Sequence, residues 1–94
     1  MTLSELARQS ATDYIANPQF TEGNLFFADG SFLQFVHKSR DERWARPSTD
    51  DSTAGMVCRG LRQFRLNAKH LQLYFDDGDA EFFAQTPNSP SIQS

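Results

Sequence analysis

Two apolar segments flank the dipeptide Asp29-Gly30 in the stretch Asn24-Leu25-Phe26-Phe27-Ala28-Asp29-Gly30-Ser31-Phe32-Leu33-Gln34-Phe35-Val36-His37-Lys38. An Asp-Gly pair between apolar runs is a strong signal for a two-residue β-hairpin turn, because both central positions of a type I′ turn require positive φ. We therefore predict an antiparallel hairpin in which Phe27 faces Phe32 across the two strands.

The predicted hairpin is apolar on both of its faces. In this register Phe26, Leu33 and Phe35 lie on one face, and a second set of apolar residues lies on the other. A hairpin that buries only one side would instead alternate apolar and polar residues. We therefore expect both faces of this ribbon to be covered.

The segment before the hairpin is predicted to be a helix from Thr2 to Asn17. Thr2 and Glu5 have the spacing of a capping box, in which the hydroxyl and the carboxylate each satisfy an otherwise free backbone N–H. Apolar and small residues then recur at the spacing of one helical face. Asn17-Pro18 is expected to end the helix, since a residue that precedes proline avoids helical dihedral angles.

A second β region follows the hairpin. Met56–Leu66 is predicted to be one long strand, in which Gly60 marks a bend or a bulge. The pair Asp77-Gly78 is predicted to be the turn between two further strands, Leu71–Phe75 and Ala80–Gln85.

These elements predict an α+β fold with an N-terminal helix packed on one antiparallel sheet of about five strands. Two hairpins and the long strand would form a curved sheet or a half-barrel. A chain of 94 residues is long enough for one domain, which we assign to residues 1–85, followed by a flexible tail at 86–94. The charged segment Ser39–Ala54 is predicted to be a long loop, and its first part is expected to extend the preceding strand.

The composition excludes several classes of protein. The chain is 38% hydrophobic and 13% aromatic, which is too apolar for a wholly disordered protein. Its longest apolar run, Leu25–Ala28, is far too short to span a membrane. Glu5 and Arg8 stand where a signal peptide would be apolar, and the single Cys58 cannot form an internal disulfide. We therefore predict a cytoplasmic protein with no membrane partner.

Basic residues are concentrated in the middle of the chain. The net charge is -3, but residues 38–69 carry eight bases and four acids, whereas residues 70–94 carry four acids and no lysine or arginine. The overall acidity argues against a dedicated nucleic-acid binder, because phosphate contacts need a sustained cationic surface. Binding of nucleic acid through residues 38–69 is kept as an alternative.

No arrangement of residues predicts catalysis or metal binding. Cys58 has no activating partner near it in the sequence and is expected to be a small buried side chain. His37 and His70 have no second ligand at coordinating spacing. The acids at 76, 77, 79 and 81 lack the ligand spacing of a calcium loop. We therefore predict a protein that is not an enzyme and that needs no metal or cofactor.

Six residues are the candidates for partner binding. Trp44 lies among three arginines, and this composition is typical of an interface hot spot: Arg40, Arg43 and Arg46. The alternative is a tryptophan folded back onto the core, with the arginines in solvent. Arg59 and Arg65 would share one face of the predicted long strand, where they could contact an acidic partner.

The nine phenylalanines suggest how the protein acts. One helix can cover only one face of a sheet, so the other aromatic face is expected to meet a second subunit, a partner protein or an apolar ligand. A homodimer is the simplest answer, since two-fold pairing is the commonest oligomer. We predict a small non-catalytic protein-binding module, an inhibitor or an adaptor, that acts through an aromatic sheet face and the Trp44 loop. The alternatives are nucleic-acid binding and a carrier that holds a small apolar ligand in a half-barrel or in a dimer-enclosed cavity.

Overall fold

The computed structural model describes residues 1–17, 21–67 and 69–84, and the predicted tail at 86–94 lies outside them. The described chain forms two helices and seven strands: α1 (Leu3–Ser10), β1 (Ala11–Asn17), β2 (Glu22–Phe27), β3 (Phe32–His37), β4 (Arg43–Pro47), α2 (Thr53–Gly60), β5 (Gln63–Leu66), β6 (His70–Phe75) and β7 (Gly78–Phe83). The prediction of an α+β fold with antiparallel strands is confirmed. The prediction of a single five-stranded sheet is wrong, because the described strands form two sheets, and neither of them is a closed barrel.

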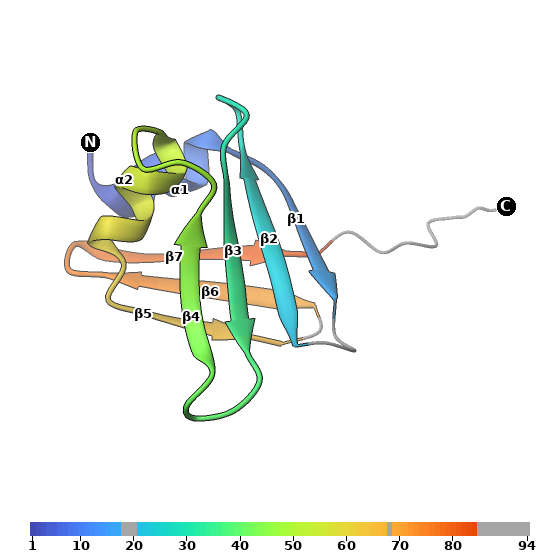
Figure 1. Cartoon of the computed structure of the whole chain (residues 1–94). Helices are drawn as coiled ribbons and strands as arrows, with labels where there is room; N and C mark the ends of the chain where they lie inside the picture. The colour runs from blue at the N-terminus through green and yellow to red at the C-terminus, as the bar shows by residue number, and fades with distance from the viewer. Residues whose placement is uncertain (18–20, 68, 85–94) are drawn as a thin grey trace, which may run out of the picture.

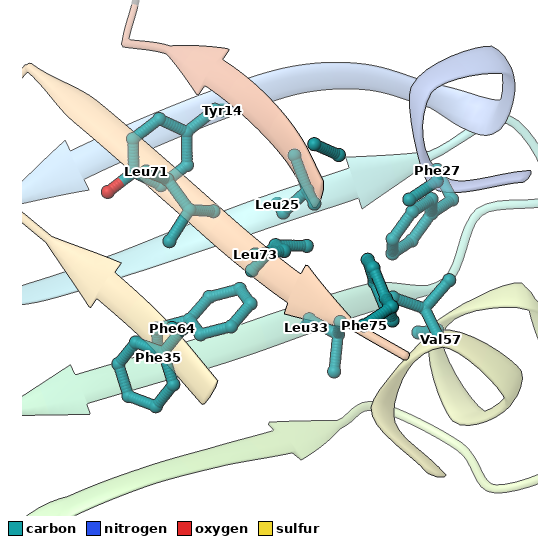
Figure 2. Packing of buried hydrophobic residues seen from close by; sticks show 13 residues of the cluster. Tyr14, Leu25, Phe27, Leu33, Phe35, Val57, Phe64, Leu71, Leu73 and Phe75 are labelled. Atoms are coloured by element: carbon teal, nitrogen blue, oxygen red, sulfur yellow. The ribbon is translucent and has the colours of Figure 1, made fainter. Parts of the chain in front are cut away.

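The two sheets are stacked with their strands crossing (Figure 1). One sheet has the order β1-β2-β3-β4 and the other has the order β5-β6-β7. Alternate residues of both sheets point into the space between them, so each sheet buries one face against the other. The largest fully buried side chains there include Leu25, Phe35, Leu71 and Leu73 (Figure 2). The second sheet, and not only a helix, therefore covers the inner face of the β2–β3 hairpin.

Both helices lie at one end of the stacked sheets (Figure 1). Helix α1 packs on β6 and β7, whereas α2 packs on β3 and β4, and the two helices also contact each other. None of the described helices has the length and the apolar character that crossing a membrane would require.

Helix α1 begins as predicted and ends much earlier. The capping box is present, with the Thr2 hydroxyl accepting from the backbone N–H of Glu5 and the Glu5 carboxylate accepting from the N–H of Thr2. The helix ends at Ser10, and the chain continues directly as strand β1, which pairs with β2. The predicted helix to Asn17 is therefore wrong. Pairing with β2 and burial of the Tyr14 ring in the core stabilise the extended form instead.

The β2–β3 hairpin exists, but its register differs by one residue from the prediction. The N–H of Gly30 donates to the carbonyl of Phe27, and Gly30 has φ +89°, so the loop has three residues with a left-handed residue at its end. Leu25 therefore faces Leu33, and Phe26 faces Phe32. A one-residue shift moves every side chain of a strand to the other face of the sheet relative to its partner strand.

The predicted long strand Met56–Leu66 is also wrong. The first half of this segment belongs to α2, for which Ser52 is the N-cap. Only the last four residues of the segment form a strand, β5. In the predicted loop 39–54, Arg43–Pro47 forms a separate strand that pairs with β3. The second hairpin turns at Asp76-Asp77, one residue before the predicted turn, so that Phe75 faces Gly78.

Candidate functional site

The outer face of the four-stranded sheet carries apolar and aromatic side chains that no other described element covers. Strand alternation and the register place six residues of interest on this face, which we call the outer sheet face: Ile15, Phe26, Phe32, Val36, Trp44 and Arg46. Of these, Val36 is itself buried. Figure 1 shows this face toward the viewer, with no helix or strand in front of it. The opposite face of the same sheet packs on β5, β6 and β7.

The aromatic residues of the outer sheet face are held by contacts with one another. The ring centroids of Phe26 and Phe32 are 5.6 Å apart. The Arg46 guanidinium carbon lies 4.3 Å from the centroid of the Trp44 ring. A cation at this distance over an indole is attracted by the negative face of the ring. Both pairs are cross-strand or same-strand neighbours, so the sheet backbone itself fixes their spacing.

Trp44 is neither fully exposed nor folded back onto the core. It is half-buried on the outer side of β4, where it faces Val36 of β3. It does not enter the core between the sheets. At the far edge of the same face, Ile15 of β1 is 52% exposed. The face thus presents apolar surface across all four strands of the sheet.

The predicted partner-binding residues do not form one cluster. Trp44 and Arg46 lie together on the outer sheet face. Arg40 is exposed in the turn between β3 and β4. Arg59 is exposed on α2, where its side chain donates to the carbonyl of Asp50 at 3.0 Å.

The remaining two arginines belong to the other sheet or contact it. Arg43 points to the inner side of β4, and its Nη2 donates to the carbonyl of Phe64 on β5. Its guanidinium carbon is 4.7 Å from the centroid of the Phe64 ring. Arg65 is exposed on β5, on the side of the three-stranded sheet that points away from the core.

The predicted apolar face is divided between two environments. Phe26 lies on the outer sheet face, whereas Leu33 and Phe35 are fully buried between the sheets, where the Phe35 ring meets Phe64 at 5.1 Å (Figure 2). The grouping of these three residues was a consequence of the incorrect register. Phe32 is the residue that joins Phe26 instead, because the loop has three residues with Gly30 at the third position.

Cys58 has the environment of a packing residue. Its Sγ is half-buried and lies 3.6 Å from the carbonyl oxygen of Ala45, to which it donates. Burial, with the negative charge of Asp50 as a further cause, raises the pKa of the Cys58 thiol. A raised pKa keeps the thiol protonated, which is the opposite of what a nucleophilic cysteine requires.

The acidic residues near the second hairpin turn contact helix α1 and a nearby arginine. The Asp77 carboxylate accepts from the N–H of Leu3 at 2.9 Å, and the Asp79 carbonyl accepts from Arg8 at 2.8 Å. The Asp76 carboxylate lies 3.4 Å from Arg62. Within residues 1–17, 21–67 and 69–84, no three side chains of the metal-ligating types come together.

No family model, curated protein or solved structure matches this chain. Its function therefore has to be argued from the residues and from the surfaces that the fold leaves uncovered.

Proposed function

We propose that this chain is a small non-catalytic protein-binding module that docks on its partner through the outer sheet face. The observation that carries the proposal is the uncovered four-stranded sheet with the Phe26–Phe32 pair and the Trp44–Arg46 pair on its outer side. Soluble domains with a sheet of this kind ordinarily cover an apolar face or use it for binding.

The chemistry of the face fits a protein partner. Tryptophan and arginine are enriched among the residues that carry most of the binding energy of interfaces. Trp44 and Phe32 are half-buried already, so they are held in place before a partner arrives and lose little side-chain entropy on binding. Polar residues of the same face, Asn24 and Gln34, lie beside them and can satisfy the hydrogen bonds of a partner backbone.

The two alternatives have less support from the described residues. An apolar carrier needs an open interior, whereas the space between these two sheets is filled by the side chains of the core cluster (Figure 2). A nucleic-acid binder needs a continuous cationic surface. The basic residues of the middle segment are instead divided among different elements, with Arg46 on one sheet, Arg65 on the other and Arg59 on α2.

The test compares Trp44→Ala with a matched aromatic control. Phe83 is 68% exposed on the outer side of the other sheet, so Phe83→Ala removes an aromatic side chain from a different and more exposed surface. Partners are captured from a lysate on each immobilised variant and on the wild type. Self-association is measured in parallel by sedimentation velocity, because a second copy of the chain is one of the candidate partners.

Trp44→Ala is expected to weaken capture or self-association about thirtyfold, the effect of losing a hot spot of about 2 kcal/mol. Phe83→Ala is expected to bind as the wild type does. Circular dichroism spectra of both variants should match that of the wild type. The proposal fails if wild-type protein neither captures a partner nor self-associates. It also fails if the two variants lose binding to the same extent.

A further inference from the structure

A second surface, separate from the outer sheet face, has the character of a binding site for a small anion. It is a pocket of about 370 Å³ where the β3–β4 hairpin of one sheet meets the edge strand β5 of the other. Figure 1 shows β4 crossing β5 in this region. None of the lining residues that the structure describes is acidic, and they include Arg43, Phe64, Arg65, Leu66, Asn67 and Gln72.

Two of the side-chain amides that line this pocket already use their oxygens to accept hydrogen bonds from the protein. The Asn67 side-chain oxygen accepts from the N–H groups of Lys69 and His70 at 2.9 and 2.8 Å. The Gln72 side-chain oxygen accepts from the Tyr74 hydroxyl at 3.0 Å. The amide NH₂ groups of Asn67 and Gln72 keep their donor capacity, as amides have two donors each. The pocket is therefore rich in donors, which is the requirement for binding an anion.

Two arginines supply positive charge to the same pocket. Arg65 makes no ion pair with any residue in the described part of the chain. Arg43 is fixed by its hydrogen bond to the Phe64 carbonyl and by its position over the Phe64 ring. A guanidinium has five N–H donors, so this one bond leaves Arg43 able to bind a further acceptor.

One acid, Glu81, contacts a histidine that lines the pocket. Glu81 on β7 faces Gln72 in the register of the sheet, and its Oε2 lies 3.2 Å from Nε2 of His70. The His70 ring is stacked on Phe83 with a centroid distance of 4.7 Å. This contact keeps the Glu81 carboxylate on His70, two strands away from Arg65.

The shape of the site favours a compact ligand over an extended peptide. Strand β5 is at the edge of its sheet, and an edge strand can pair with an added peptide through its free backbone groups. Arg43 already occupies the Phe64 carbonyl in the middle of β5, which removes an acceptor that such pairing would need. The volume lies within the range of about 300–1,000 Å³ that is usual for sites of small molecules.

We propose that this pocket binds a small organic anion. Its phosphate or carboxylate group would be bound by Arg65, Arg43 and the amide of Gln72, with its apolar part against Phe64 and Leu66. Charge-assisted hydrogen bonds from arginine to an oxyanion are the strongest contacts that these residue types can offer. The site shares no residue with the outer sheet face, so this proposal does not depend on the proposed protein-binding function.

The test is a titration of the isotope-labelled full chain, followed by NMR, with three probes that share an aromatic ring. Phenyl phosphate and benzoate carry the two anionic groups, and benzyl alcohol is the neutral reference. Each probe is added up to about 10 mM, which detects affinities in the millimolar range. The proposal is supported if phenyl phosphate, benzoate or both produce saturable chemical-shift changes at pocket residues. The probe that binds more tightly identifies the anionic group that the pocket prefers.

Two variants distinguish a defined site from general attraction by positive charge. Arg65→Gln removes a lining arginine and is expected to weaken binding of the anion at least about tenfold. Arg62→Gln makes the same change of charge three residues earlier, at an exposed arginine that pairs with Asp76 and does not line the pocket. It should leave the affinity unchanged. The proposal is overturned if neither anion produces saturable shifts there, if benzyl alcohol binds as tightly, or if both variants lose affinity equally.

Discussion

Substitution of Ser31 by alanine is expected to destabilise the fold by disconnecting the first hairpin from helix α2. Ser31 lies at the end of the β2–β3 loop and is 6% exposed. Its Oγ accepts from the N–H of Ala54 at 3.1 Å and donates to the Asp29 carboxylate. The same carboxylate accepts from the N–H of Thr53 at 2.9 Å. Two of the first amides of α2 are therefore satisfied by a loop more than twenty residues away in the chain.

The expected magnitude follows from the burial of the group that would lose its partner. Ala54 is 0% exposed, so its N–H is a buried donor that loses its partner when the hydroxyl is removed. A buried donor without a partner costs about 1–3 kcal/mol, and we expect about 2 kcal/mol for Ser31→Ala. For a domain of this size, that loss lowers the melting temperature by roughly 10 °C.

Urea unfolding, followed by circular dichroism and by Trp44 fluorescence, measures the loss. The matched control is Ser39→Ala, because the Ser39 hydroxyl accepts from the N–H of Glu42 in an exposed turn, where water can replace it. The control should stay within about 0.5 kcal/mol of the wild type. A loss for Ser31→Ala no larger than that of the control would refute the reasoning.

The pH dependence provides a second check on the same contact. The hydrogen bond from Ser31, with further bonds from the N–H groups of Thr53 and Ser31, holds the pKa of the Asp29 carboxyl well below its usual range. A lowered pKa in the folded state stabilises the protein above the unfolded pKa, near 3.9, and this contribution is lost as the pH falls toward the folded pKa. The difference in stability between wild type and Ser31→Ala should therefore narrow below about pH 4.

Three further substitutions probe the packing of the core and of α2. Tyr14→Phe removes a buried hydroxyl that has no hydrogen-bond partner among the described residues, so stability at pH 7 should be unchanged or rise by up to about 1 kcal/mol. Burial also raises the pKa of Tyr14 to about 12. Because tyrosine in the unfolded chain ionises at a lower pH, the wild type should lose stability above about pH 10. An equally steep loss of stability in Tyr14→Phe at alkaline pH would contradict this. Gly55→Ala would place a Cβ against the backbone carbonyl of Asp50, with an expected loss of about 1–3 kcal/mol in urea unfolding. Gly60→Ala meets only the end of the flexible Leu3 side chain, and it should cost less; equal losses would show that the Asp50 contact is not rigid.

The sequence predicts the start of α1 because the signal there is local. Thr2 and Glu5 are three residues apart, and both hydrogen bonds of the capping box form between them. The end of the helix at Ser10 depends instead on pairing of the following residues with β2, which begins only at Glu22. Ala11 and Tyr14 fit the helical spacing, whereas in a regular strand residues three apart lie on opposite faces. The register of β1 shifts between Ala11 and Asp13, and such an irregularity cannot be read from periodicity.

The start of α2 depends on contacts that no local pattern contains. Ser52 is a local N-cap for Gly55, but the amides of Thr53 and Ala54 are satisfied from the first hairpin. A short segment with a mixed pattern was therefore predicted to be a strand. The contact of Arg43 with Phe64 could not be predicted from local sequence either, because it joins two sheets across twenty-one positions of the chain.

A difference of one residue in the length of the first hairpin loop determines which side chains lie on the outer sheet face. Asp29-Gly30 predicts a turn correctly, but the loop can have either two or three residues, and the two choices invert the faces of β3 relative to β2. The observed loop buries Leu33 and Phe35 and leaves Phe32 beside Phe26 on the outside. The proximity of Trp44 and Arg46 was predictable, because residues two apart on a strand share a face.

We expected that one helix could not cover both aromatic faces of the first hairpin. Because the protein has two sheets, this expectation now applies only to the outer face of the hairpin. The inner side of the β2–β3 hairpin is covered by β5, β6 and β7, which removes most of the apparent excess of phenylalanine. The outer side keeps a Phe26–Phe32 pair and a Trp44–Arg46 pair, which lie outside the core between the two sheets. The proposed docking on a partner would account for these side chains, because the core between the two sheets does not contain them.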